Sequence, residues 1–328
     1  MFEVMTQDIR DLVSDTCDLL GFGEPSHGDP AFGRFRNEAF ARLAERGFRS
    51  FALETDRVAA FVVDDFVRDG VGTLDAAMSE GFSHGFGAFD ANRELVAWMR
   101  QYNADRPAAE RLAFHGIDAP LEFTAASPRR DLEYVRDYLG LELDLGSLVG
   151  QDERWSRMEA VTDPAASPGD TAEARQLRVI ADDMLTALYA GAPELIASTS
   201  RATWFRAKAH VTSGLGLLRY HRQAAQHIGE SERWSRLSAT RDALMAQNLL
   251  DIRDIEGRRG PTMVSAANIH LQMNVSEMSM AGMDLTWFGT GAIIASVSGE
   301  RYTFVAGSLD PSEGPRVEAP PQQNRIDA

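Results

Sequence analysis

The chain has 328 residues, of which 44% are hydrophobic and 25% are charged, the range of an ordinary globular protein with one large domain or a domain carrying an insertion. Its formal net charge of −16 and pI near 4.9, with no basic block, argue against nucleic acid as a partner. The first residues are acidic where a signal peptide is basic and then apolar, and no apolar run is long enough to cross a membrane. We therefore expect a cytoplasmic protein with no membrane partner.

The first third of the chain alternates short apolar runs with amphipathic stretches. Apolar runs at residues 17–24 and 48–54 flank a helical pattern at 31–46, which predicts strand, helix, strand. A further helical pattern at 91–103 precedes the apolar run LAFHGIDA, which predicts a third strand. Strands that alternate with helices are typical of a mainly parallel sheet flanked by helices, so the predicted fold class is α/β.

The later part of the chain changes character twice. Residues 129–256 carry apolar side chains at three- and four-residue spacing, which predicts a helical insertion or cap. PTMVSAAN then predicts a strand, and AIIASVSG and RYTFVAGS predict two late strands joined by a hairpin at Ser298–Glu300. We therefore expect an α/β core of residues 1–128 and 257–308, a helical cap of residues 129–256, and a flexible tail of residues 309–328.

Polar side chains follow four of the predicted strands. In open α/β sheets, ligands bind outside the carboxyl ends of the strands. One such strand end alone is typical of a turn or a cap, but four at the same sheet edge indicate a functional site. The residues concerned are Glu24 and His27, Glu54 and Asp56, His115 and Asp118, and Asn268 and His270.

His27 has two chemical interpretations. It can act as a general base whose tautomer is fixed by Glu24 or Glu54, because imidazole titrates near neutral pH. It can also bind a metal with these carboxylates, although the spacing matches no specific pattern such as HExxH, so neither a metal nor another cofactor is favoured. GEPSHG is not a GxSxG elbow, and no phosphate-binding glycine motif occurs in the chain.

Several segments resemble one known family. GFGEPSHG resembles the GExxHG opening motif of the erythromycin esterase family, which includes succinoglycan biosynthesis proteins. LVAWMRQYN, FHGIDA, RDALMAQN and SAANIHL are similar to its WLRxYN helix end, third strand, RDxxMAxN helix and AHNxH segment, in the same order from about Leu19 to Gly307. The resemblance implies an α/β core with a helical cap subdomain that forms the active-site cleft.

The resemblance also implies roles for individual residues. His27 matches the general base that activates water against an ester or lactone carbonyl, and Arg36 matches a site arginine suited to a developing oxyanion. The catalytic residues implied by the family are Glu24, His27, Arg36, Glu54 and His270. The predicted substrate contacts are His84, Asp118, Arg241 and Asn268.

One position departs from the family pattern, because Ala267 stands where the first histidine of AHNxH is expected. Loss of such a donor costs about a hundredfold in rate, which puts efficient macrolide lactone hydrolysis in question. The first hypothesis remains hydrolysis of an ester or lactone of a small molecule. The alternatives are a biosynthetic cyclisation, elimination or condensation that uses the same base, and a non-catalytic ligand-binding homologue.

Overall fold

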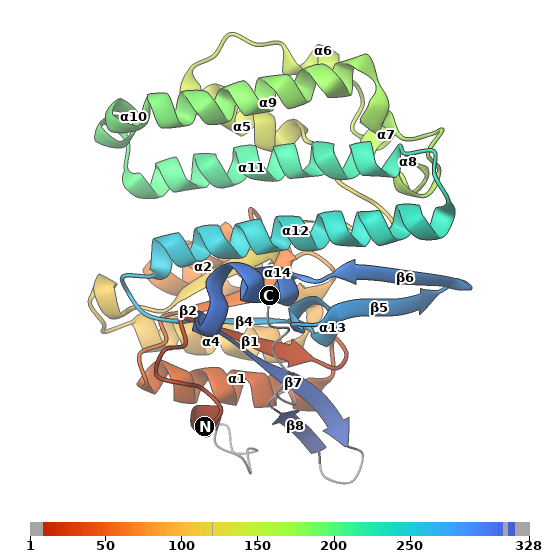
Figure 1. Ribbon diagram of the computed structural model, residues 1–328. Helices are drawn as coiled ribbons and strands as arrows, with labels where there is room; N and C mark the ends of the chain where they lie inside the picture. The colour runs from red at the N-terminus through yellow and green to blue at the C-terminus, as the bar shows by residue number, and fades with distance from the viewer. Residues whose placement is uncertain (1–8, 120, 311–313, 319–328) are drawn as a thin grey trace. The chain divides into compact units, whose positions relative to one another are not determined.

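The computed structural model describes residues 9–119, 121–310 and 314–318, and the chain divides into two compact units (Figure 1). The α/β unit comprises Met1–Asp118, Met245–Met278 and Thr286–Ala328. The helical unit comprises Ala119–Leu244 and Ser279–Leu285.

The described strands are β1 Leu19–Glu24, β2 Ser50–Asp56, β3 Ala113–Asp118, β4 Thr262–Ala267, β5 Val275–Met280, β6 Met283–Phe288, β7 Tyr302–Asp310 and β8 Gly314–Glu318. The described α-helices are α1 Pro30–Glu45, α2 Ala60–Asp69, α3 Leu74–Glu80, α4 Asp90–Asn103, α5 Arg129–Leu139, α6 Leu145–Val149, α7 Glu153–Ser156, α8 Glu159–Thr162, α9 Ala172–Ala190, α10 Ala192–Ser198, α11 Arg201–Ala224, α12 Glu230–Glu256, α13 Asn268–Leu271 and α14 Thr290–Ser298. Short 3-10 helices are η1 Ile9–Asp11, η2 Phe86–Ala88, η3 Ala108–Glu110, η4 Pro168–Asp170 and η5 Gly299–Arg301.

The main sheet has the strand order β3-β2-β4-β1-β7-β8, while β5 and β6 form a separate pair. Strands β3, β2, β4, β1 and β7 are parallel, and β8 is antiparallel to β7. Glu24 at the end of β1 lies opposite Ala267 at the end of β4. The carboxyl ends of these strands therefore meet at one edge, as the predicted α/β fold requires.

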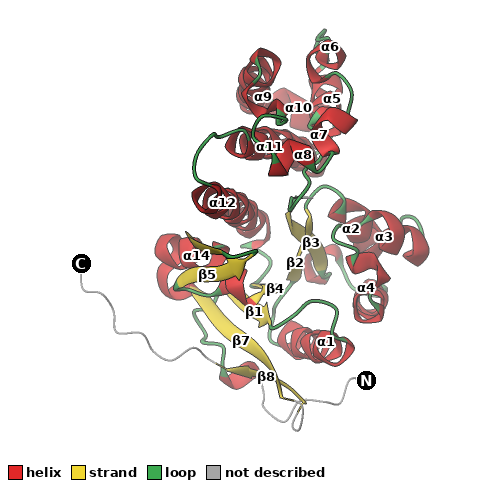
Figure 2. Cartoon of the chain, turned by 90° about the vertical axis from the view of Figure 1, so that its right-hand side faces the viewer, coloured by secondary structure: helices red, strands yellow, loops and turns green. Residues whose placement is uncertain are grey.

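Helices cover both faces of this sheet (Figure 2). Along β2, Phe51 and Leu53 belong to the core shared with α1 to α4, whereas Ala52 belongs to the core shared with residues 245–252 of α12 and with α14. This alternation follows the two-residue period of a strand, and burial on both faces explains why consecutive residues of β2, Phe51 to Leu53, are all apolar.

The connection from β1 to α1 is short and fixed at the helix start. The Asp29 carboxylate accepts a hydrogen bond from the Phe32 N–H at 2.8 Å, and Pro30 occupies the first helical position, where no N–H is needed. Only five residues separate Glu24 from Pro30, so His27 lies directly above the end of β1.

Two expectations for the C-terminal part of the chain are wrong. Residues of AIIASVSG form helix α14 instead of a late strand, so no hairpin lies at Ser298–Glu300. A short apolar run fits a buried helix as well as a buried strand, and here Ile294 packs into the core as a helical residue. Gly314–Glu318, expected within a flexible tail, form β8. Residues 309–310 of that predicted tail end β7, and residues 311–313 and 319–328 lie outside the described residues.

Long helices build the helical unit, as the apolar spacing of residues 129–256 predicted. Its core contains Trp155, Leu177 and Met184, and helices α9 and α11 begin at the capping side chains Thr171 and Ser200. No helix in the described part of the chain is long and apolar enough to cross a membrane. The assignment of this unit as a cap over the cleft stays a prediction.

Candidate active site

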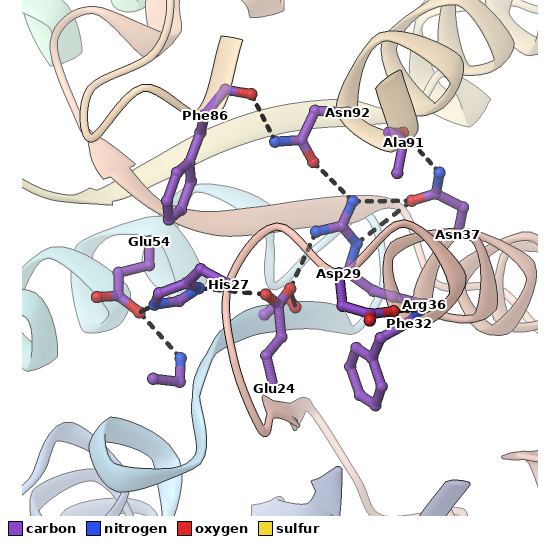
Figure 3. Close-up of polar contacts among 12 residues, drawn as sticks. Glu24, His27, Asp29, Phe32, Arg36, Asn37, Glu54, Phe86, Ala91 and Asn92 are labelled. Carbon is purple, nitrogen blue, oxygen red and sulfur yellow. Dashed lines mark hydrogen bonds and ion pairs between the residues drawn. The ribbon is translucent and has the colours of Figure 1, made fainter. Parts of the chain in front are cut away.

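His27 lies between two carboxylates at the carboxyl edge of the sheet (Figure 3). Its Nδ1 is 3.3 Å from Oε2 of Glu24, and its Nε2 is 3.3 Å from Oε2 of Glu54. Both carboxylate side chains are almost fully buried, whereas 31% of the His27 side chain is exposed. The imidazole is therefore the accessible member of the group.

Glu24 is held on its other oxygen by two donors. Nη1 of Arg36 donates to Oε1 of Glu24 at 3.0 Å, and Oγ of Ser265 donates to the same oxygen at 2.6 Å. Burial raises the pKa of Glu24, but the hydrogen bond from His27, the charge of Arg36 and the bond from Ser265 outweigh it and hold this pKa below its usual value. Glu24 is thus a fixed negative charge beneath the imidazole.

Glu54 links His27 to the segment after β4. Its Oε2 accepts a hydrogen bond from the backbone N–H of Ala267 at 2.9 Å, and its Oε1 lies 3.5 Å from Nε2 of His270. Alanine at position 267 contributes no side-chain donor, but its backbone orients the carboxylate. The structure thereby brings all five predicted catalytic residues into one connected set, Arg36, Glu24, His27, Glu54 and His270.

The two carboxylates control the protonation of His27. Burial alone lowers the pKa of an imidazole, but hydrogen bonds to Glu24 and Glu54, together with their charges, raise the pKa of His27 to about 10. At neutral pH the resting form is the imidazolium, which donates one N–H to each carboxylate. A neutral ring that can accept a proton becomes common only as the pH rises toward 10.

Arg36 is enclosed by partners that sequence reasoning did not identify. Its Nε and Nη2 donate to Oδ1 of Asn37, and Nη2 also donates to Oδ1 of Asn92 at 2.7 Å. The Asn92 amide then donates to the carbonyl of Phe86 at 2.9 Å, and the Phe86 ring lies 4.9 Å from the His27 ring. These contacts suit Arg36 to positioning Glu24, and its predicted contact with an oxyanion stays a prediction.

The missed residues carry weak sequence signals. Ser265 is one of two hydroxyl residues in the otherwise apolar strand β4, and Asn37 and Asn92 are polar residues on the buried faces of α1 and α4. A buried polar side chain needs a partner, so such positions mark a polar network. Their common partner, Arg36 or Glu24, becomes visible only in three dimensions.

Three of the four residues predicted to contact substrate, His84, Asp118 and Asn268, lie in the α/β unit, and the fourth, Arg241, lies in the helical unit. Nε2 of His84 is 3.0 Å from Oδ2 of Asp118, so these two residues form a pair in the α/β unit. Asn268 donates to the Gly307 carbonyl and accepts from the Gly307 N–H, and its predicted contact with substrate stays a prediction. Arg241 lies on α12 within the helical unit, and its contact with substrate stays a prediction.

The possible metal donors around His27 are already paired with one another. Among the described residues, no group of three histidine, cysteine, aspartate or glutamate side chains is arranged to hold a metal ion. Glu24 is already neutralised by the Arg36 guanidinium, and both nitrogens of His27 face carboxylates. A divalent cation requires deprotonated ligands that point toward a common centre.

The sequence matches the erythromycin esterase family over residues 43–327. The chain belongs to this family. Because the match begins at residue 43, the assignment of Glu24, His27 and Arg36 to the site rests on the geometry described above. No curated protein matches the sequence. Erythromycin esterase family membership supports an esterase-like or related function.

Several solved structures share the fold. A protein from Bacillus cereus is 16% identical with a TM-score of 0.64, over 97% of this chain and 74% of that one. A variant of the erythromycin esterase EreC, in its open conformation, is 19% identical with a TM-score of 0.62, over 93% of this chain and 76% of that one. A succinoglycan biosynthesis protein is 15% identical with a TM-score of 0.61, over 94% of this chain and 72% of that one.

Proposed function

We propose that this chain hydrolyses an ester or lactone of a small molecule, with water activated by His27. The observation that carries the proposal is the imidazole held between two buried carboxylates at the carboxyl edge of the sheet. Glu24 is the fixed partner, because Arg36 and Ser265 already hold it. It keeps the proton on Nδ1, so that the proton which the imidazolium donates to Glu54 from Nε2 is the one lost when the ring becomes neutral, and Nε2 is the nitrogen that then acts as the base.

In the reactive form His27 is neutral, and Nε2 takes a proton from water as the water oxygen attacks the carbonyl carbon. The tetrahedral intermediate then collapses, the carbon–oxygen bond of the leaving group breaks, and the imidazolium returns the proton to the departing oxygen. No metal takes part in this proposal. Because the pKa of His27 is about 10, the reactive fraction grows about tenfold per pH unit through neutral and mildly alkaline pH.

The test compares wild type with His27→Gln on p-nitrophenyl esters and simple lactones from pH 6 to about pH 10, after subtraction of spontaneous hydrolysis. We expect wild-type kcat/KM to rise with pH, and His27→Gln to lose about a thousandfold. The matched control is His227→Gln, the same substitution at an exposed histidine of the helical unit, which should keep wild-type activity. Equal activity in His27→Gln, or a rate that falls with pH, would contradict the assignment.

A second candidate uses the same base to remove a proton from a substrate carbon or hydroxyl, as in a cyclisation, elimination or condensation. Ala267 favours this reading, since the family histidine expected there is replaced by a side chain without donor or acceptor atoms. A wild-type protein that leaves every activated ester and lactone intact would contradict the hydrolytic proposal, and proton exchange on the substrate carbon would then support this candidate.

A further inference from the structure

A cavity of about 180 Å³ lies beside His27 within the α/β unit. One wall comes from the loop between β1 and α1 and from the first turns of α1, and the other comes from residues 86–92. The greater part of the lined surface is apolar, and its polar groups come from Glu24, Ser26, His27, Asp29, Arg36, Asp90 and Asn92. The apolar part of the lining consists of Pro30, Phe32, Phe86, Ala88, Phe89 and Ala91.

Two glycines let the walls approach closely, which limits the size of the cavity. A Cβ atom on Gly28, whose φ is +78°, would come within 2.9 Å of the Phe89 ring. A Cβ atom on Gly33 would come within 2.6 Å of Cβ of Ala91. Larger residues at either position would push residues 86–92 away from α1. The side chains of Phe89 and Ala91 therefore lie directly against the glycine backbone of the opposite wall, and the two walls cannot come closer without repacking.

The two aromatic side chains of this wall have different neighbours. The Phe86 ring is 4.9 Å from the His27 ring, so Phe86 supports the catalytic imidazole directly. The Phe89 ring is 5.4 Å from Phe86 and packs against Gly28. Substitution at Phe89 therefore changes the space in the cavity without removing the ring that contacts His27.

We propose that this cavity is the subsite for a compact apolar group on one side of the scissile bond. Its volume is close to that of a cavity of about 150 Å³ that binds benzene, and well below the roughly 300 Å³ at which pockets for drug-sized ligands begin. The group is therefore a short alkyl chain or a single aromatic ring, and a macrolactone is too large to enter. The inference rests on the proposed hydrolysis at His27.

The first experiment measures kcat/KM for two ester series, one that varies the acyl group against p-nitrophenol and one that varies the alcohol of an acetate. In one series we expect a gain of up to about tenfold per methylene and then a decline beyond a benzyl-sized group. Phe89→Leu should move this optimum to larger groups, and Phe89→Trp to smaller ones. The series that shows the optimum identifies whether the acyl or the alcohol side enters.

Phe82→Leu is the matched control, because Phe82 lies in the same loop but lines a different hollow. It should leave the optimum where wild type has it. A flat profile in both series, or an optimum that neither Phe89 variant moves, would overturn the subsite while leaving hydrolysis in place.

The second experiment measures ligand binding in the cavity without any ester turnover. Saturation-transfer NMR should detect benzyl alcohol bound to wild type, no binding of 1-naphthylmethanol, and at least about tenfold weaker benzyl alcohol binding to Phe89→Trp. A protein that binds benzyl alcohol in this way but hydrolyses no ester would support the subsite and contradict the proposed function. Wild type that binds neither alcohol, or that binds both equally, would overturn the subsite whatever the turnover.

Discussion

The two units of the chain each place a histidine in a setting that shifts its pKa, and the shifts are opposite. In the helical unit, burial lowers the pKa of His221 to about 4, although its bond to the Ala126 carbonyl opposes this. In the α/β unit, burial acts on His27 in the same direction, yet Glu24 and Glu54 raise its pKa to about 10.

The difference between the two histidines lies in charge. His221 packs edge-on against Trp155 at 5.1 Å, and its Nδ1 has no hydrogen-bond partner among the described residues. His27 has a carboxylate on each nitrogen. Burial without a counter-charge keeps a histidine neutral and inert, whereas burial beside fixed carboxylates creates a strongly basic group.

Glu54→Gln should have the largest effect on the contrast between the two histidines, because it removes one of the two carboxylate charges that face His27. We expect the alkaline rise in kcat/KM to move to lower pH by about one unit or more, and the maximal rate to fall about a hundredfold. The pH profile of ester hydrolysis measures both effects. Glu256→Gln is the matched control, since Glu256 binds His115 at 3.0 Å elsewhere in the same unit. A pH profile unchanged by Glu54→Gln would show that Glu54 does not set the basicity of His27.

The low pKa of His221 predicts an effect on stability. The pKa of His221 is lower in the folded state, so protonation at acid pH favours the unfolded chain. The stability that the neutral ring contributes is fully present above about pH 6.5 and is lost as the pH falls to about 4. The difference between the pKa values of the unfolded and folded states corresponds to about 3 kcal/mol in the free energy of unfolding. Urea unfolding from pH 7 to pH 4, followed by tryptophan fluorescence, should show this loss in wild type and a smaller loss in His221→Phe. The exposed His227→Phe should behave like wild type, and an equal acid loss in all three proteins would contradict the interpretation.

Ala267→His has the smallest expected effect. It adds an imidazole beside Glu54, whose Oε2 already accepts the backbone N–H of residue 267. We expect ester hydrolysis to rise by no more than about tenfold, below the effect of a full oxyanion donor. Dialysis against a chelator should leave kcat/KM of wild type and variant unchanged, because the donors around His27 are paired with one another. Activity that is lost on chelation and restored by a divalent metal would show that a metal takes part.

The sequence was sufficient to predict the parts of the fold that follow local rules. Strands β1, β2 and β3 appear as apolar runs separated by helical patterns, and polar residues after such runs located Glu24, His27 and Glu54. Helix α14 was mistaken for a strand because a short apolar run has no distinctive period. Strand β8 was missed because its sequence, GPRVE, carries two residues that are poor strand formers and gains its hydrogen bonds from β7.

The site residues that were missed depend on contacts between distant segments. Asn92 is separated by 56 residues from Arg36, and Ser265 by 241 residues from Glu24. Nothing in the local sequence around either residue indicates its partner. The pKa of His27 could not be predicted for the same reason, because it depends on both carboxylates reaching one ring.

The strand order of the sheet has a consequence for how the protein is made. Strand β1 pairs on one side with β4 and on the other with β7, so Leu19 lies between Thr262 and Tyr302. At a synthesis rate on the order of 10 residues per second, β1 emerges from the ribosome about half a minute before its second neighbour. Pairings so distant in sequence also fold slowly. The newly made chain must therefore keep this apolar strand from aggregating until almost all of the sheet has been translated.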